Sequence, residues 1–204
     1  MPAVFLTADP HFGHEGVCRF KVHEGTPQER KLRPFDNAAE MNEVLVKNWN
    51  EAVRPNDKVY VLGDVAMNKN ALHATMPRLN GDKVLIKGNH DILKKPDYER
   101  YFRDTRAYHV MNGVILSHIP IHKDSLARFG CNIHGHLHAH EVRKARGVDA
   151  KTGAVLYSNE IDPDYLCVSM EHTNFTPILF EDALKRIIER GGTVGFKNTK
   201  ERDM

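Results

Sequence analysis

The sequence predicts an α/β fold in which two β-sheets stack and helices flank them. Short apolar runs typical of buried strands recur along the chain, and several end abruptly in polar residues. Apolar residues at helical spacing lie between the early runs, whereas the second half is richer in strand-like runs. The 204 residues can build one substantial core, and no linker-like stretch divides them. We therefore expect a single domain over residues 1–204.

The expected elements follow from local patterns. Residues 3–8 predict a strand, and the polar segment 15–36 an irregular loop. A helix is expected over 38–53, because Met41, Leu45 and Trp49 recur at helical spacing after an Asn37–Glu40 pair with capping-box spacing. The last dozen residues are polar and are expected to fray. The other expected elements are strands at 58–62, 83–87, 131–134, 141–146, 154–157 and 165–170, a hairpin of 105–110 and 113–118, short helices at 71–79 and 98–102, and an amphipathic helix at 179–189.

Five expected strands end in aspartate, histidine or asparagine side chains. The run at 83–87 shows this most clearly, because it stops at Gly88 and is followed by Asn89, His90 and Asp91. In open α/β sheets, ligands bind outside the carboxyl ends of the strands, so these ends could converge on one edge. Carboxylates, imidazoles and amide oxygens are metal-ligand types. The other polar ends are Asp9 with His11, Asp64, His118, and the segment from His134 to His138.

These strand ends resemble, in order, the five motifs of the calcineurin-like metallophosphoesterases. The motifs span residues 9–138, and no ligand position is substituted. The stretch from Asp9 to His14, with Arg33-Pro34-Phe35 and Met41-Asn42, is similar to a small bacterial and phage branch of that superfamily. The resemblance implies a four-layer α/β/β/α sandwich with its metal site at the strand ends. The five motifs are Asp9-Pro10-His11, Gly63-Asp64, Gly88-Asn89-His90-Asp91, His118, and Gly135-His136-Leu137-His138.

The resemblance also implies two divalent metal ions. Asp64 would bridge them, and each ion would have three further ligands. Two ions ~3.5–4 Å apart neutralise phosphoryl charge, orient the ester and generate a bound hydroxide for attack. Because the set contains no sulfur ligand, we prefer Mn²⁺, with Fe²⁺, Zn²⁺ or Ni²⁺ as alternatives. The further ligands are Asp9, His11 and His138 for the first ion and Asn89, His118 and His136 for the second.

His90 is the predicted catalytic residue. It would stabilise negative charge on the phosphate or protonate the leaving oxygen, with Asp91 holding its ring in one tautomer. The predicted substrate-binding residues are Asn89, His90 and His14, although a simple surface turn is the alternative for His14. His134 is expected to hydrogen-bond backbone beneath the site.

The loop at 15–36 allows two interpretations. It contains five cationic side chains among few apolar ones, so it is either a solvated surface loop or a flap that binds substrate phosphate. The five are Arg19, Lys21, Arg30, Lys31 and Arg33.

The expected activity is that of a phosphodiesterase, in which a metal-bound hydroxide attacks a nucleotide-type diester; the expected partner is such a nucleotide or another small phosphate ester. A phosphomonoesterase with the same site, a nuclease acting on nucleic-acid ends, and a non-catalytic metal-binding module are the alternatives. The net charge of +2 gives no global basic field, so contact with nucleic acid would have to be local. Three scattered cysteines and no membrane-length apolar run favour a cytoplasmic protein without a membrane partner. The pattern indicates no oligomeric state.

Overall fold

The larger sheet is organised around three parallel strands, β1 (Val4–Thr7), β4 (Lys58–Val61) and β5 (Asp82–Ile86). This computed structural model describes residues 2–196. β6 (Asp104–Arg106) continues the sheet in parallel and β13 (Ile178–Leu179) closes the other edge antiparallel, in the order β13-β1-β4-β5-β6. The carboxyl ends of β1, β4 and β5 therefore lie side by side at one edge.

The smaller sheet has the order β12-β9-β8-β7. β9 (Cys131–His134) pairs in parallel with β8 (Val114–Ser117) and β12 (Tyr165–Cys167), whereas β7 (Tyr108–Met111) forms an antiparallel hairpin with β8. The sequence predicted one hairpin over 105–118, but the chain changes sheets within it. Residues of β6 pair with β5 of the larger sheet, and only β7 belongs to the hairpin.

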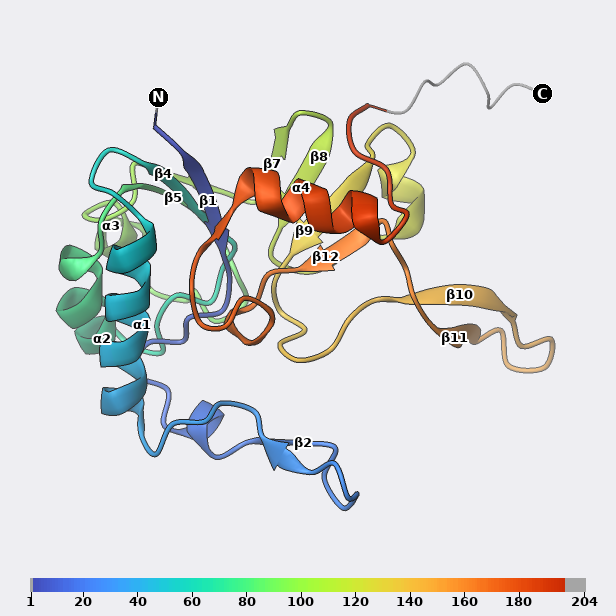
Figure 1. Cartoon of the computed structure of the whole chain (residues 1–204), viewed down its shortest axis with the longest axis horizontal. Coiled ribbons are helices and arrows are strands. Elements are labelled where there is room, and N and C mark those ends of the chain that lie inside the picture. The colour runs from blue at the N-terminus through green and yellow to red at the C-terminus, as the bar shows by residue number, and fades with distance from the viewer. Residues whose placement is uncertain (1, 197–204) are drawn as a thin grey trace.

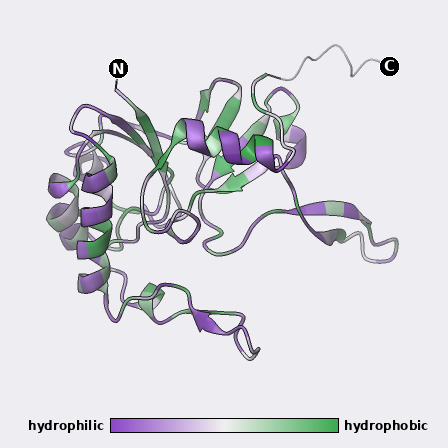
Figure 2. Ribbon diagram, in the orientation of Figure 1, coloured by the Kyte–Doolittle hydropathy of each residue, from purple (hydrophilic) through white to green (hydrophobic). Residues whose placement is uncertain are grey.

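The two sheets pack face to face around one apolar layer. Because successive side chains of a strand point to opposite faces, Leu6 faces the second sheet and Phe5 faces away from it. Figure 2 shows hydrophobic residues along the strands of both sheets. α4 (Phe180–Glu189) adds Ala183 and Ile187 to this layer and contacts β1, β12 and β13. Other members of the layer are Leu62, Val84, Ile86, Leu116, Ile133 and Leu166.

Helices cover the outer face of the larger sheet. α1 (Ala38–Ala52) begins at Asn37, whose side chain accepts a hydrogen bond from the Glu40 backbone, and it buries Met41, Leu45 and Trp49. α2 (Lys69–Thr75) and α3 (Lys95–Tyr98) lie beside it (Figure 1). The predicted class, two mixed sheets flanked by helices, is confirmed. The outer face of the smaller sheet is covered by the short 3₁₀ helix η3 (Lys123–Leu126).

Two small hairpins lie outside the sheets. The polar loop contains β2 (Lys21–Val22) and β3 (Arg30–Lys31), and β10 (Arg143–Val148) pairs with β11 (Val155–Ile161) in an arm that projects from the body (Figure 1). Most of the tail expected to fray, residues 197–204, lies outside the described residues. No helix within 2–196 has both the length and the apolar character needed to cross a membrane. The remaining 3₁₀ helices are η1 (Gly16–Cys18), η2 (Met76–Arg78) and η4 (Met170–His172).

Candidate metal centre

The polar residues that follow the strands converge at one place. The loops after β1 and β4 are joined by backbone hydrogen bonds, from Asp9 N–H to the Gly63 carbonyl and from His11 N–H to the Asp64 carbonyl. Six of the seven predicted ligands form two groups, and within each group one ligand atom per residue lies within 4.8 Å of the others. The first group is Asp9, His11 and His138, and the second is Asp64, His118 and His136. The seventh, Asn89, contacts the second group.

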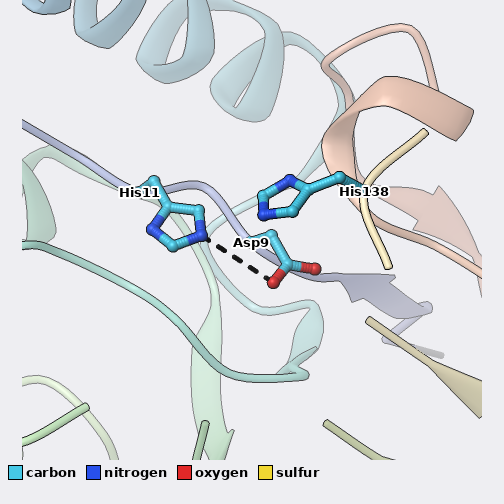
Figure 3. A group of neighbouring side chains, drawn as sticks. All are labelled: Asp9, His11 and His138. Carbon is cyan, nitrogen blue, oxygen red and sulfur yellow. Dashed lines mark ion pairs between the residues drawn. The ribbon is translucent and has the colours of Figure 1, made fainter. Parts of the chain in front are cut away.

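Asp9 and His11 of the first group are buried, and His138 is partly buried. His11 is only 3% exposed and its ring stacks on that of His138, with centroids 5.1 Å apart. The Nε2 of His11 faces the Oδ1 of Asp9 at 4.0 Å (Figure 3). Within the described part of the chain, neither atom has a hydrogen-bond partner. Buried polar atoms without partners are costly, and a cation held between imidazole and carboxylate would satisfy both.

Burial also sets the electrostatics of the first group. It raises the pKa of Asp9 to about 6, although the neighbouring His138 and His118 oppose the shift. A divalent cation at this carboxyl would favour its charged form. A bound metal ion would therefore satisfy these donor atoms better than an empty pocket does.

The second group brings several hydrogen-bond acceptors together. The Nδ1 of His118 lies 2.9 Å from the Leu62 carbonyl oxygen, which can only accept, so in the neutral ring Nδ1 carries the proton. The free Nε2 then faces the Oδ1 of Asn89 at 2.8 Å, and the same oxygen lies 3.0 Å from the Nδ1 of His136. Acceptors that meet without a proton between them repel one another, whereas a cation coordinates them together.

Asp64 faces both groups with one oxygen. Its Oδ2 lies 3.6 Å from the Nε2 of His11 in the first group and 3.4 Å from the Nε2 of His118 in the second. Its Oδ1 accepts a hydrogen bond from the His90 backbone at 2.8 Å, which fixes the carboxylate. This is the arrangement that a bridging ligand requires.

The ligand backbone is strained. Five predicted ligands have a positive φ, a region in which a non-glycine residue costs roughly 1–3 kcal/mol. Such outliers cluster at functional sites, where the surrounding structure holds them in place. Aspartate and histidine are enriched among the few non-glycine residues that adopt this conformation. The five are Asp9 (55°), His11 (50°), Asp64 (55°), His136 (69°) and His138 (50°).

Two glycines make room for the ligands. A Cβ on Gly88 would collide with the carboxylate and backbone of Asp64, and one on Gly135 would collide with the Asp9 carboxylate and the Ala8 side chain. Each glycine belongs to a different motif from the aspartate that it touches. The motifs therefore fit one another sterically, which explains why Gly-Asn and Gly-His pairs begin two of them.

A buried network that the sequence did not predict supports the first group. The Nδ1 of His138 lies 3.1 Å from the Oε1 of Glu171, and the same oxygen accepts from the Nε of Arg33 at 2.7 Å. Ser169 donates to the Oδ2 of Asp9 at 2.6 Å. Burial alone would raise the pKa of Glu171, but the His138 hydrogen bond and the Arg33 charge hold it at about 2. Glu171 therefore fixes His138 with its Nε2 free for a metal.

A pattern in the sequence could have revealed Ser169 and Glu171. Ser169 lies near the end of the expected strand at 165–170 and Glu171 directly follows it, much as the predicted ligands lie at the ends of other expected strands. Their motif was missed because it does not belong to the family pattern.

Neither interpretation of the loop, a solvated surface or a phosphate-binding flap, holds for Arg33. Its side chain is fully buried, and its guanidinium donates to the backbone carbonyls of Asp9 and Pro10 in addition to Glu171. Five rigid donors suit a buried position in which several oxygens need partners. Arg33 thus stabilises the strained loop after β1 from the protein interior, where solvent does not reach it.

The predicted role of Asp91 is also wrong. Its carboxylate accepts from three backbone N–H groups, those of Asp64, Val65 and Gly88, at 2.8–3.0 Å. It therefore ties the loops after β4 and β5 together and does not orient the His90 ring. The expected contact of His134 with backbone is confirmed, since its Nδ1 lies 2.7 Å from the Gly135 carbonyl.

The two remaining predicted site residues flank the first group. The His90 and His14 rings each lie 5.5 Å from the His11 ring, and neither belongs to a ligand group. The Nδ1 of His14 accepts from the Val17 backbone at 3.0 Å, so in the neutral ring its Nε2 carries a proton that it can donate. His90 is exposed at the centre's surface.

Among the other loop cations, two have acidic partners. Lys21 pairs with Glu29 at 2.6 Å within the exposed β2–β3 hairpin, and Lys31 of β3 pairs at 3.4 Å with Asp36, which lies just before α1. Arg19 and Arg30 are exposed. The structure therefore places these four side chains in the solvated part of the loop.

Comparisons with known proteins give relatives without a described function. The fold is similar to the crystal structure of the protein of unknown function AQ665 from Aquifex aeolicus, with a TM-score of 0.62 and 21% identity over 91% of this chain and 99% of that one. No family model matches the chain. The sequence is 32% identical over 199 residues to the uncharacterised protein MJ1445 of Methanocaldococcus jannaschii, covering 95% of this chain and 96% of that protein. The chain therefore belongs to the same protein family as MJ1445.

Proposed function

We propose that this protein is a calcineurin-like, binuclear metal-dependent phosphodiesterase of the cytoplasm. The observation that carries the proposal is the position of the Asp64 Oδ2, which lies within 3.6 Å of a ligand nitrogen from each group. Two ligand groups that share one carboxylate oxygen fit a pair of divalent cations, and oxygen and nitrogen donors without sulfur favour Mn²⁺. When bound, such a pair neutralises phosphoryl charge and activates water.

The protein's own side chains would divide the remaining work. The Nε2–H of His14 would donate to a phosphoryl oxygen, and the amide of Asn89 would bind the phosphate beside the second group. In the hydrolysis, a water molecule loses one proton to solvent as its oxygen attacks phosphorus, and the opposite ester P–O bond breaks. His90 gives a proton to the departing oxygen and regains one from solvent, so one water is consumed for each diester. The products are a phosphomonoester and an alcohol.

A substrate panel on the Mn²⁺-loaded protein tests this function. We expect turnover of bis-p-nitrophenyl phosphate to exceed that of p-nitrophenyl phosphate and to disappear after chelation. Elemental analysis of the same sample checks that the metal is present. Faster hydrolysis of the monoester would favour the phosphomonoesterase, and a fully loaded protein that hydrolyses neither ester would refute the proposal.

A further inference from the structure

A cavity of about 830 Å³ adjoins the second ligand group. Asn89 and His118 form part of its wall, whereas neither the ligands of the first group nor His90 or His14 border it. Its volume lies within the range of small-molecule sites in proteins. The cavity therefore lies beside the second group, whereas the His90 ring lies beside His11 of the first group.

The wall of the cavity is largely apolar. Ile115, Ile119, Ile121 and Phe129 line it, and Ile119, which follows the ligand His118, is 54% exposed. An exposed large apolar side chain directly beside a candidate metal ligand indicates a binding surface.

Two polar groups of the wall have partners within the protein. The Ser117 hydroxyl donates to the Ile119 carbonyl at 2.7 Å, and the Arg106 guanidinium contacts Asp104 at 2.6 Å and His109 at 2.7 Å. Further polar residues also border the cavity, namely Lys87, Thr105, Tyr108 and Ser125. The isoleucine and phenylalanine side chains of the wall would supply apolar contact to a ligand of suitable size.

We propose that this cavity, named here the Ile119 pocket after its exposed wall residue, binds the ester group that the enzyme retains. The substrate is then a diester whose retained substituent is a planar or bulky apolar group. This inference rests on the proposed function, because it needs the phosphate at the metal centre and the leaving group beside His90. It goes further because it assigns the retained ester group to the Ile119 pocket and specifies that this group is apolar.

Two diesters with the same leaving group test the pocket. Phenyl p-nitrophenyl phosphate and methyl p-nitrophenyl phosphate both release p-nitrophenolate and differ only in the retained group. For the Mn²⁺-loaded full chain we expect kcat/KM to be about ten- to hundredfold higher for the phenyl ester, from the added apolar area buried. Equal values would overturn the inference, since the retained group would then lie in solvent.

Two pocket variants and a control variant test whether the preference for the phenyl ester arises in the Ile119 pocket. Ala107 borders the pocket, so Ala107→Trp should fill it, and Ile119→Asn should make its wall polar. Both should lower the phenyl-to-methyl ratio, whereas Ala154→Trp, in the exposed turn of the β10–β11 arm, should keep the wild-type ratio. An unchanged ratio in both pocket variants would refute the assignment.

Calorimetry with phosphonates separates this inference from the proposed function. Phenylphosphonate should bind the loaded protein at least tenfold more tightly than methylphosphonate, and Ala107→Trp should remove the difference. If neither ester is hydrolysed but this preference is found, the proposed catalysis fails and the pocket stands. Equal phosphonate affinities would overturn the pocket whether or not the protein is an enzyme.

Discussion

The two ligand groups differ in how the fold holds them. Asp9 and His138 are fixed by a buried network, in which Ser169 and Glu171 supply hydrogen bonds and Arg33 supplies charge. In the second group, His136 and Asn89 are exposed and contact each other across the cavity edge. We infer that the first group serves as an anchor for its metal, while the second leaves room for substrate.

The largest expected effect comes from Asp64, the residue that the groups share. Asp64→Asn removes the negative charge between two cations, so metal content should fall at both sites. The loss of several kcal/mol of transition-state stabilisation corresponds to on the order of 10³-fold or more in turnover. Elemental analysis with kinetics checks this. Two metals per chain in an active variant would remove the bridging assignment.

A substitution of Glu171 should affect the two groups differently. Glu171→Gln should release His138 and weaken the first metal by about 10–100-fold while affecting the second less. Because Arg33 would lose its buried partner, the unfolding midpoint should also fall. Mn²⁺ titrations followed by calorimetry distinguish the two sites. The surface pair Glu141–Arg190 offers the matched control, Glu141→Gln, for which we expect neither change. Equal weakening at both sites would contradict the anchor role.

A substitution of His90 should reduce turnover without reducing metal content. If His90 protonates the leaving oxygen, His90→Asn should slow alkyl diesters by ~10²–10⁴-fold and p-nitrophenyl diesters much less, because p-nitrophenolate needs no proton. Metal content should stay at the wild-type level, since His90 belongs to neither group. An equal loss for both ester types would exclude the general-acid role, and loss of metal would make His90 part of the centre.

The smallest effect is expected in the solvated hairpin. Lys21 pairs with Glu29 on the exposed β2–β3 hairpin, away from the buried network. Lys21→Ala should leave the unfolding midpoint, metal content and steady-state constants at their wild-type values, because exposed ion pairs contribute little. A raised KM without loss of metal would restore the interpretation of this loop as a phosphate-binding flap.

The sequence predicted features that depend on neighbouring residues, but not those that depend on residues far apart in the chain. Apolar runs and the polar residues that end them are local signals, so the helix beginning at Asn37 and the strand ends carrying Asp64 and His118 were placed correctly. The partners of Arg33 are not local. Glu171 lies 138 residues away in sequence, and an arginine in a polar loop gives no sign that it is buried.

Asp91 shows the same limit at shorter range. It stands next to His90 in the sequence, which made a carboxylate–imidazole pair the natural expectation. Instead, its two carboxylate oxygens accept hydrogen bonds from three backbone N–H groups of two loops. These N–H groups come together only when β4 and β5 pair. Local motifs identified the residues of the two candidate ligand groups, whereas tertiary packing decided which residues support them.

Anomalous diffraction from Mn²⁺-loaded crystals, recorded at the manganese edge, tests the central claim most directly. Two peaks should appear ~3.5–4 Å apart. Asp64 should contact both, with His138 beside one and His118 beside the other. A single peak, or two peaks that do not share Asp64, would contradict a binuclear centre built from the two ligand groups.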